Sequence, residues 1–146
     1  MDMILWRHAD AENGSPDSAR KLTERGREQA RRVAAWLEPR LPPGCEILVS
    51  PAARAQQTAL ALGVPFVTSP AVGIDARAGD IIVAAQWPAR SGAVLIVGHQ
   101  PTLGRVAAML LSGAEADWDV GKGALWWFQH IDDETNLFAV IDPQIA

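Results

Sequence analysis

The sequence predicts an α/β fold in which helices flank both faces of a mainly parallel central sheet. The main observation is an alternation along the chain, because short, wholly apolar runs are each followed by a stretch of helical character. Such runs are typical of strands buried on both faces, and strand-helix alternation is typical of parallel sheets. The composition agrees, since 146 residues with 49% hydrophobic and 21% charged side chains can bury a full core. We therefore expect one domain over residues 1–146.

The first expected strand is Met3–Trp6, a continuous apolar run that stops at Arg7. The helix expected next covers residues 23–38 and is closed by Pro39. Its apolar side chains recur at positions i, i+3, i+4 and i+7, which places them on one face: Ala30, Val33, Ala34 and Leu37.

The second expected strand, residues 46–49, is followed directly by Ser50-Pro51. Serine is a preferred helix N-cap, and proline is favoured at the first helical position. We therefore expect a helix that is capped by Ser50 and runs to Gly63.

The third expected strand covers residues 93–97. Gln100-Pro101 then opens a helix over residues 103–111, which ends near Gly113.

The remaining elements are less distinct. The stretch 65–88 predicts only one short strand and one short helix near residues 80–86. Residues 124–129 and 137–141 alternate in the manner of strands, and a turn through 132–134 would join them as a hairpin on the sheet.

Charge and cysteine usage exclude several classes of protein. The net charge is −4 and no Lys/Arg-rich block occurs, so we expect no nucleic-acid partner. Cys45 is the only cysteine, which excludes an intrachain disulfide and favours a buried thiol in a reducing compartment. The chain has no signal-peptide pattern and no run of about 18 apolar residues, so we expect a cytoplasmic protein with no membrane association.

Polar and basic side chains follow three of the expected strands. Arg7 and His8 come after the first, Ser50 and Arg54 after the second, and His99 after the third. Carboxyl ends of parallel strands meet at one edge of a sheet, beside helix N-termini that favour anions. The planar guanidinium of arginine also matches phosphate. The shared position therefore predicts a site for a dianionic ligand of the phosphate type.

The segment Leu5-Trp6-Arg7-His8-Ala9 resembles the Arg-His-Gly/Ala signature of the histidine phosphatase superfamily. Further segments follow in the family's order: Leu22-Thr23-Glu24-Arg25-Gly26 at the first helix, Ser50-Pro51 with Arg54-Ala55 and Gln57-Thr58 around the second phosphate arginine, Val97-Gly98-His99-Gln100-Pro101 at the second histidine, and Lys122-Gly123-Ala124-Leu125 late in the chain. Length and motifs are most similar to the compact SixA-like phosphohistidine phosphatases. The resemblance covers nearly the whole chain and implies a phosphoglycerate mutase-like fold.

The resemblance also implies catalytic roles. His8 would attack phosphorus and form a phosphohistidine, which water then hydrolyses. Arg7 and Arg54 would bind the phosphoryl oxygens, and His99 would donate a further hydrogen bond to them. An imidazole with an ordinary pKa of about 6.5 is largely neutral in the cytosol, so His8 needs neither an adjacent base nor a metal. No cofactor or metal is expected, because no Asp/Glu/His cluster of metal-ligand spacing accompanies the histidines.

The proton donor is the least defined part of the expected site. Phosphomonoesterase and mutase relatives use a Glu, whereas Asp75 and Asp80 are the only acidic residues in the corresponding region here. Each is a candidate general acid, with a turn or helix N-cap as the alternative role. Ala9 stands where glycine is commoner in the family, and Lys122 is a candidate substrate contact.

The expected function is hydrolysis of phosphohistidine on a phosphorylated protein, such as a phosphorelay or phosphocarrier protein. One alternative is a small-molecule phosphomonoesterase or mutase-like enzyme that uses the same site. Another is a non-catalytic module that binds phosphoproteins. Keeping both His8 and His99 favours an enzyme, because binding alone needs only the arginines.

Overall fold

Six strands form a single sheet in the computed structural model, which describes all 146 residues. They are β1 (Asp2–Arg7), β2 (Glu46–Val49), β3 (Val67–Thr68), β4 (Ala93–Gly98), β5 (Leu125–Ile131) and β6 (Glu134–Ile141). Their order across the sheet is β3-β2-β4-β1-β5-β6. The first four strands are mutually parallel, and β5 and β6 are antiparallel to their neighbours. The prediction of a mainly parallel sheet is confirmed.

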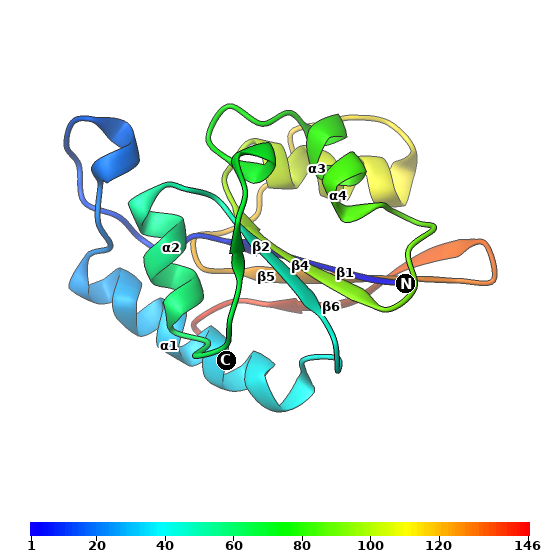
Figure 1. The fold of residues 1–146 in the computed structure, drawn as a ribbon, viewed down its shortest axis with the longest axis horizontal. Coiled ribbons are helices and arrows are strands. Elements are labelled where there is room, and N and C mark those ends of the chain that lie inside the picture. Colours follow the sequence, from blue (N-terminus) through cyan, green and yellow to red (C-terminus); the bar gives the residue numbers. More distant parts are fainter.

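Helices cover both faces of this sheet, as predicted. Figure 1 shows α1 (Glu24–Leu37) and α2 (Ala53–Leu60) on one side, and α3 (Ala78–Ala85) and α4 (Thr102–Ser112) on the other. Short 3₁₀ turns at Asp17–Ala19, Glu38–Arg40 and Pro70–Val72 complete the regular structure.

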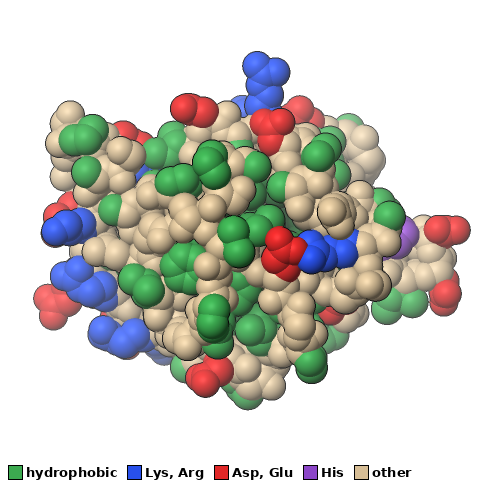
Figure 2. All heavy atoms as spheres, in the orientation of Figure 1, with side chains coloured by type: hydrophobic (Ala, Val, Ile, Leu, Met, Phe, Trp, Pro, Cys, Tyr) green, Lys and Arg blue, Asp and Glu red, His purple; other side chains and the backbone are tan.

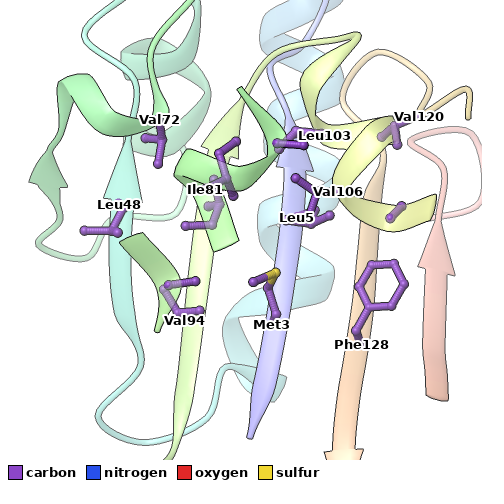
Figure 3. Packing of buried hydrophobic residues seen from close by; sticks show 14 of the residues in the cluster. Met3, Leu5, Leu48, Val72, Ile81, Val94, Leu103, Val106, Val120 and Phe128 are labelled. Atoms are coloured by element: carbon purple, nitrogen blue, oxygen red, sulfur yellow. The ribbon is translucent and has the colours of Figure 1, made fainter. Parts of the chain in front are cut away.

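The core has two layers, one on each face of the sheet. Along β1, Met3 and Leu5 belong to the cluster under α3 and α4, whereas Ile4 and Trp6 belong to the cluster under α1 and α2. Figure 3 shows the first cluster, in which Phe128 of β5 packs on the same side as Met3 and Leu5. Burial on both faces explains why β1 is a continuous apolar run rather than an alternating one.

The helix that follows β2 differs from its prediction. It begins at Ala53 rather than at Ser50-Pro51, has no side-chain cap, and ends at Leu60 rather than at Gly63. The Ser50 hydroxyl accepts from the backbone N–H of Ala52 at 3.2 Å, before the helix begins, and it also contacts the ring of His99 at 2.7 Å. The serine that predicted a cap therefore bonds the turn before α2 and belongs to the candidate site as well.

The other elements lie close to their predicted positions. Thr23 is the N-cap of α1, and its side chain accepts a hydrogen bond from the backbone N–H of Gly26. The late strands form the predicted hairpin but are longer than expected, because Asp132 and Asp133 make the whole turn with φ angles of 52° and 61°. Aspartate tolerates this left-handed conformation better than most residues.

Charges of both signs are interspersed over the side of the molecule that Figure 2 shows, with Lys and Arg most frequent near the beginning of α1. No helix is both long and apolar enough to cross a bilayer. Burial raises the pKa of the Cys45 thiol to about 11, so this cysteine is held as the protonated thiol.

Candidate active site

The register of the three central strands brings the predicted site residues together. Arg7 of β1 pairs with Gly98 of β4, so the next residues, His8 and His99, extend side by side from the same edge. Val49 of β2 pairs with Val97 of β4, which places Ser50 next to the same turn. The rings of His8 and His99 lie 5.2 Å apart between centroids.

His8 is almost fully buried, with 8% of its surface exposed, and both ring nitrogens have partners. Nδ1 lies 2.8 Å from the carbonyl oxygen of Ala9, and Nε2 lies 3.2 Å from Nε of Arg54. A carbonyl only accepts hydrogen bonds and a guanidinium only donates them. These partners therefore assign the proton to Nδ1 and a lone pair to Nε2.

The electrostatic surroundings of His8 keep it neutral. Burial lowers its pKa to about 3, and the nearby His99, Arg54 and Arg7 act in the same direction. The Ala9 carbonyl opposes this effect because it accepts a hydrogen bond from the ring. A neutral imidazole with an unprotonated Nε2 is the form required of a nucleophile.

Arg54 lies between His8 and the turn that contains Asp17, a residue that the sequence did not indicate as part of the site. Its side chain is buried, and beyond His8 it donates from Nη1 to the carbonyl oxygen of Asp17 at 2.8 Å and from Nη2 to the Asp17 carboxylate at 3.0 Å. The Asp17 carboxylate is about half exposed. The hydrogen bond from Arg54 lowers the pKa of Asp17, so this carboxylate is ionised at neutral pH.

His99 is also buried, and its Nε2 lies 2.7 Å from the Ser50 hydroxyl. Burial, followed by the charge of Arg54, lowers the pKa of His99 to about 4, so this ring is neutral as well. Its other nitrogen, Nδ1, has no hydrogen-bond partner in the protein.

Arg7 provides the second unpaired group. Its Nη1 donates to the carbonyl oxygen of Val120 at 2.9 Å, but its buried Nε has no partner. Arg7 Nε and His99 Nδ1 are the only two buried side-chain nitrogen or oxygen atoms in the chain without a hydrogen bond. Buried polar groups are nearly always paired in folded proteins, so two exceptions at one sheet edge indicate a place where a polar ligand binds.

The loop after β1 is held to α2 by a residue whose role the sequence did not reveal. The hydroxyl of Thr58 accepts from the backbone N–H of Ala9 at 3.1 Å and donates to the carbonyl oxygen of Arg54 at 2.7 Å. Thr58 is fully buried. The sequence signals at Thr58 are its place in the Gln57-Thr58 segment of the family resemblance and its spacing of four residues from Arg54, which places both on one face of α2.

Asp10 holds the same loop to α1 and to the segment before β5. Its carboxylate accepts from the Thr23 hydroxyl at 2.8 Å and from the Lys122 ammonium at 2.9 Å, and these hydrogen bonds lower its pKa. Gly26 permits the close approach, because a Cβ at this position would lie 2.0 Å from the carbonyl oxygen of Asp10. The Thr23–Gly26 motif at the start of α1 therefore shapes the loop that carries His8.

The side chains of the remaining candidates form no hydrogen bond with either histidine. Lys122 is about half exposed and borders a polar cleft of about 420 Å³ beside Asp10. Asp80 accepts from the backbone N–H of Arg77 at the start of α3, which is the helix-capping role. Asp75 is exposed, and neither carboxylate forms a hydrogen bond or ion pair with the predicted catalytic residues: Arg7, His8, Arg54 and His99. No group of three His, Cys, Asp or Glu side chains is arranged to hold a metal ion.

Comparison with known proteins gives consistent matches. The family model described as histidine phosphatase superfamily (branch 1) matches residues 3–72. The phosphohistidine phosphatase SixA of Escherichia coli K12 is 32% identical over 122 residues, which cover 77% of this chain and 76% of that protein. A structure of the protein histidine phosphatase SixA complexed with tungstate is 25% identical with a TM-score of 0.80, and the match covers 99% of this chain and 98% of that one.

More distant structures share the fold. A phosphoserine phosphatase mutant from Entamoeba histolytica has a TM-score of 0.73 at 15% identity, with 98% of each chain covered. The alpha-ribazole phosphatase from Shigella flexneri has a TM-score of 0.71 at 19% identity, with 100% of this chain and 98% of that one covered. The sequence shared with SixA over three quarters of both proteins, together with the family model that spans His8 and Arg54, shows that this chain belongs to the histidine phosphatase superfamily.

Proposed function

We propose that this protein hydrolyses phosphohistidine on phosphorylated proteins through a phosphoenzyme formed on His8. The observation that carries the proposal is a neutral His8 in a site with two unpaired buried nitrogens, Arg7 Nε and His99 Nδ1, and no carboxyl group hydrogen-bonded to any of these three residues. This set can bind a phosphoryl group and attack it. It provides no acid for a leaving group that needs one.

The first step transfers the phosphoryl group between two imidazoles. The Nε2 lone pair of His8 forms a bond to phosphorus, and the phosphorus–nitrogen bond of the substrate breaks, with its electron pair returning to the substrate ring. When the substrate ring carries a proton on its other nitrogen, it leaves as neutral imidazole. His8 already carries its own proton on Nδ1, donated to Ala9, so the phosphorylated His8 is the same protonated species and no proton has to move.

The second step is hydrolysis of phosphorylated His8. Water adds its oxygen to phosphorus, the bond to Nε2 breaks, and the electron pair returns to His8 as its lone pair. The two protons of the water leave with the phosphate, either bound to it or released to solvent. His8 is then neutral again with its proton on Nδ1, ready for another cycle.

Three donors stabilise the transition state in both steps. Arg7, Arg54 and His99 offset the negative charge on the phosphoryl oxygens. Arg54 is placed for this because its Nε–H already points at Nε2 of His8, and that N–H becomes free to donate to a phosphoryl oxygen once the lone pair is used for phosphorus.

Substrate preference follows from the leaving group. The conjugate acid of imidazole has a pKa of about 6.5, whereas a serine alkoxide leaves only when a proton is delivered to it. The carboxylate bound to Arg54 is that of Asp17, and its lowered pKa makes it a poor proton donor. The name of the Escherichia coli relative, a phosphohistidine phosphatase, supports the same substrate class.

The polar cleft beside Asp10, two residues after His8, supports a protein substrate. It is lined by charged and polar side chains, among them Asp10 and Lys122, with Pro143 as the single apolar one. A peptide chain that presents a phosphorylated side chain to His8 would place its neighbouring polar groups here. We infer that Lys122 contacts such a substrate.

The deciding experiment compares kcat/KM for a phosphohistidine peptide and for a phosphoserine peptide of otherwise identical sequence. We expect hydrolysis of the phosphohistidine peptide to be faster by orders of magnitude, and His8→Ala to abolish it. Alkaline quenching with labelled substrate should leave the label on His8. Equal values for the two peptides would instead establish a general phosphomonoesterase. Binding of both peptides without hydrolysis of either would establish a phosphoprotein-binding module.

A further inference from the structure

Ser50 has a hydrogen-bond geometry that determines where its hydroxyl proton lies. The residue is fully buried at the carboxyl end of β2, and its Oγ has two partners. One is the backbone N–H of Ala52 at 3.2 Å, and the other is Nε2 of His99 at 2.7 Å. The backbone N–H only donates, so Oγ accepts from Ala52, and the sole acceptor within reach of the hydroxyl proton is His99 Nε2.

This donation fixes the tautomer of His99. An Nε2 that accepts a hydrogen bond carries a lone pair, so the single proton of the neutral ring is on Nδ1. That Nδ1 is buried and has no partner in the protein. The ring is neutral rather than doubly protonated because it is buried beside two guanidinium groups, those of Arg54 and Arg7.

We propose that Ser50 is a positioning residue that holds His99 in its Nδ1–H form, so that this N–H donates to an oxygen of the bound phosphoryl group. The inference rests on the proposed function in one respect, namely that the ligand is a phosphoryl group. The assignment of the tautomer itself rests only on the contacts of Ser50.

The opposite tautomer is disfavoured for two reasons. A proton on Nε2 would require Ser50 Oγ to accept from both partners, which would leave its own buried hydroxyl proton without an acceptor. It would also leave a lone pair on His99 Nδ1, and a lone pair repels a phosphoryl oxygen. Ser50 therefore excludes the form of His99 that cannot help to bind the anion.

The direct test is nitrogen NMR of the intact protein labelled with ¹⁵N-histidine, with His99→Gln used to assign the signals. We expect a protonated Nδ1 and an unprotonated Nε2 for His99, and a shift of the Nδ1 signal when tungstate is added as a tetrahedral oxyanion. In Ser50→Ala the ring should become a mixture of tautomers. A protonated Nε2 in the unmodified protein would overturn the proposal, whatever the enzyme activity.

Measurements of kcat and KM with the phosphohistidine peptide then show whether a Ser50 substitution acts by misplacing His99 or by disturbing the fold. Ser50→Ala should lower kcat about tenfold or more with a smaller change in KM, as expected for a buried hydrogen-bond partner. Ser50→Thr, which keeps a hydroxyl, should retain the Nδ1–H form and recover much of the turnover. Ser112→Ala is the matched control, because it removes a serine hydroxyl bonded to Ala108 at the far end of α4 and should leave kcat unchanged. If Ser50→Ala alters the tautomer but not kcat, the positioning role is wrong.

The NMR and kinetic measurements test the role of Ser50 separately from the proposed hydrolysis of phosphohistidine. If the expected tautomer and tungstate shift are found but no phosphopeptide is hydrolysed, then the proposed function fails while the role of Ser50 in anion binding stands.

Discussion

Nε of Arg54 donates a hydrogen bond to Nε2 of His8 across 3.2 Å, so the guanidinium contacts the same nitrogen that we propose attacks phosphorus. Such a contact keeps a proton off Nε2 and fixes the direction of its lone pair. It also means that the charge of Arg54 lies next to the bond that forms. In the proposed mechanism, phosphate binding, orientation of the nucleophile and stabilisation of the transition state therefore all depend on the Arg54 side chain.

Replacing Arg54 by lysine should lower turnover much more than substrate affinity. Lysine keeps the positive charge but lacks the planar fork that contacts His8 and Asp17 together. We expect kcat to fall about 100-fold or more, by analogy with the loss of one preorganised donor. Steady-state kinetics measure the effect, and Arg105→Lys at an exposed ion pair is the control. A near-normal kcat would assign Arg54 a structural role only.

Asp17→Asn should tighten the binding of inorganic phosphate. The Asp17 carboxylate holds a negative charge beside the Arg54 guanidinium, which we expect to bind the phosphoryl group. In the variant, the asparagine side chain and the backbone carbonyl of residue 17 can still accept hydrogen bonds from Arg54. Because the carboxylate is about half exposed, we expect at most about a fivefold decrease in the Kd for phosphate at low salt. Calorimetric titration at low and high salt checks this, since screening should reduce the difference. Asp133→Asn in the β5–β6 turn should have no effect, and weaker binding by Asp17→Asn would show that its charge is needed to hold Arg54.

The two site histidines predict how stability depends on pH. Their folded pKa values of about 3 for His8 and about 4 for His99 lie below the value of about 6.5 expected in the unfolded chain. The unfolded state therefore binds more protons below about pH 6.5, and the free energy of unfolding falls as the pH drops from there towards about 4. Each histidine contributes a slope of up to about 1.4 kcal/mol per pH unit.

Urea unfolding at a series of pH values measures this slope. The double variant His8→Gln/His99→Gln should show a flatter dependence between about pH 6.5 and 4, because both titrating groups are removed. An unchanged slope in the double variant would mean that the histidines are not held neutral by the fold.

Gly26→Ala should damage the site through the backbone. The new methyl group would lie 2.0 Å from the Asp10 carbonyl oxygen, so the loop after β1 would have to move and would carry His8 and Ala9 with it. We expect a loss of kcat and a lower Tm. Gly79→Ala is the matched control, since it lies in α3 with open space around it and should stabilise the protein by up to about 1 kcal/mol through helix propensity. Normal kinetics in Gly26→Ala would show that the loop adapts without cost.

Much of the fold was predictable because strands that are buried on both faces consist almost entirely of apolar residues. β1 and β4 are buried on both faces, and each appears in the sequence as an unbroken apolar run. The helix periodicity of α1 was equally clear, since one face packs on the sheet and the other lies in solvent. Strand ends then indicated where Arg7, His8 and His99 would meet.

What the sequence concealed were contacts made across long separations. Asp17 reaches Arg54 from a short 3₁₀ turn 37 positions earlier, and nothing in its local sequence marks it. Ser50 suggested a helix cap because serine caps helices often, and its hydroxyl does accept from the nearby Ala52 N–H, but nothing local predicts its second contact, with His99. Local propensity describes what a residue can do with its neighbours in the chain, and both of these residues act on a partner elsewhere.

Arg54 is hydrogen-bonded to two parts of the chain, and we expect these parts to differ in how easily they unfold locally. On one side lies His8, whose backbone N–H is bonded to Gly98 between the two central strands and should exchange with solvent only when the whole domain unfolds. On the other side lies Asp17, in a segment where residues 12–19 are all exposed. We expect that segment to exchange its amide protons by small local openings. We therefore expect the contact between Arg54 and Asp17 to open by movement of the outer loop alone, while the strands that position His8 stay closed.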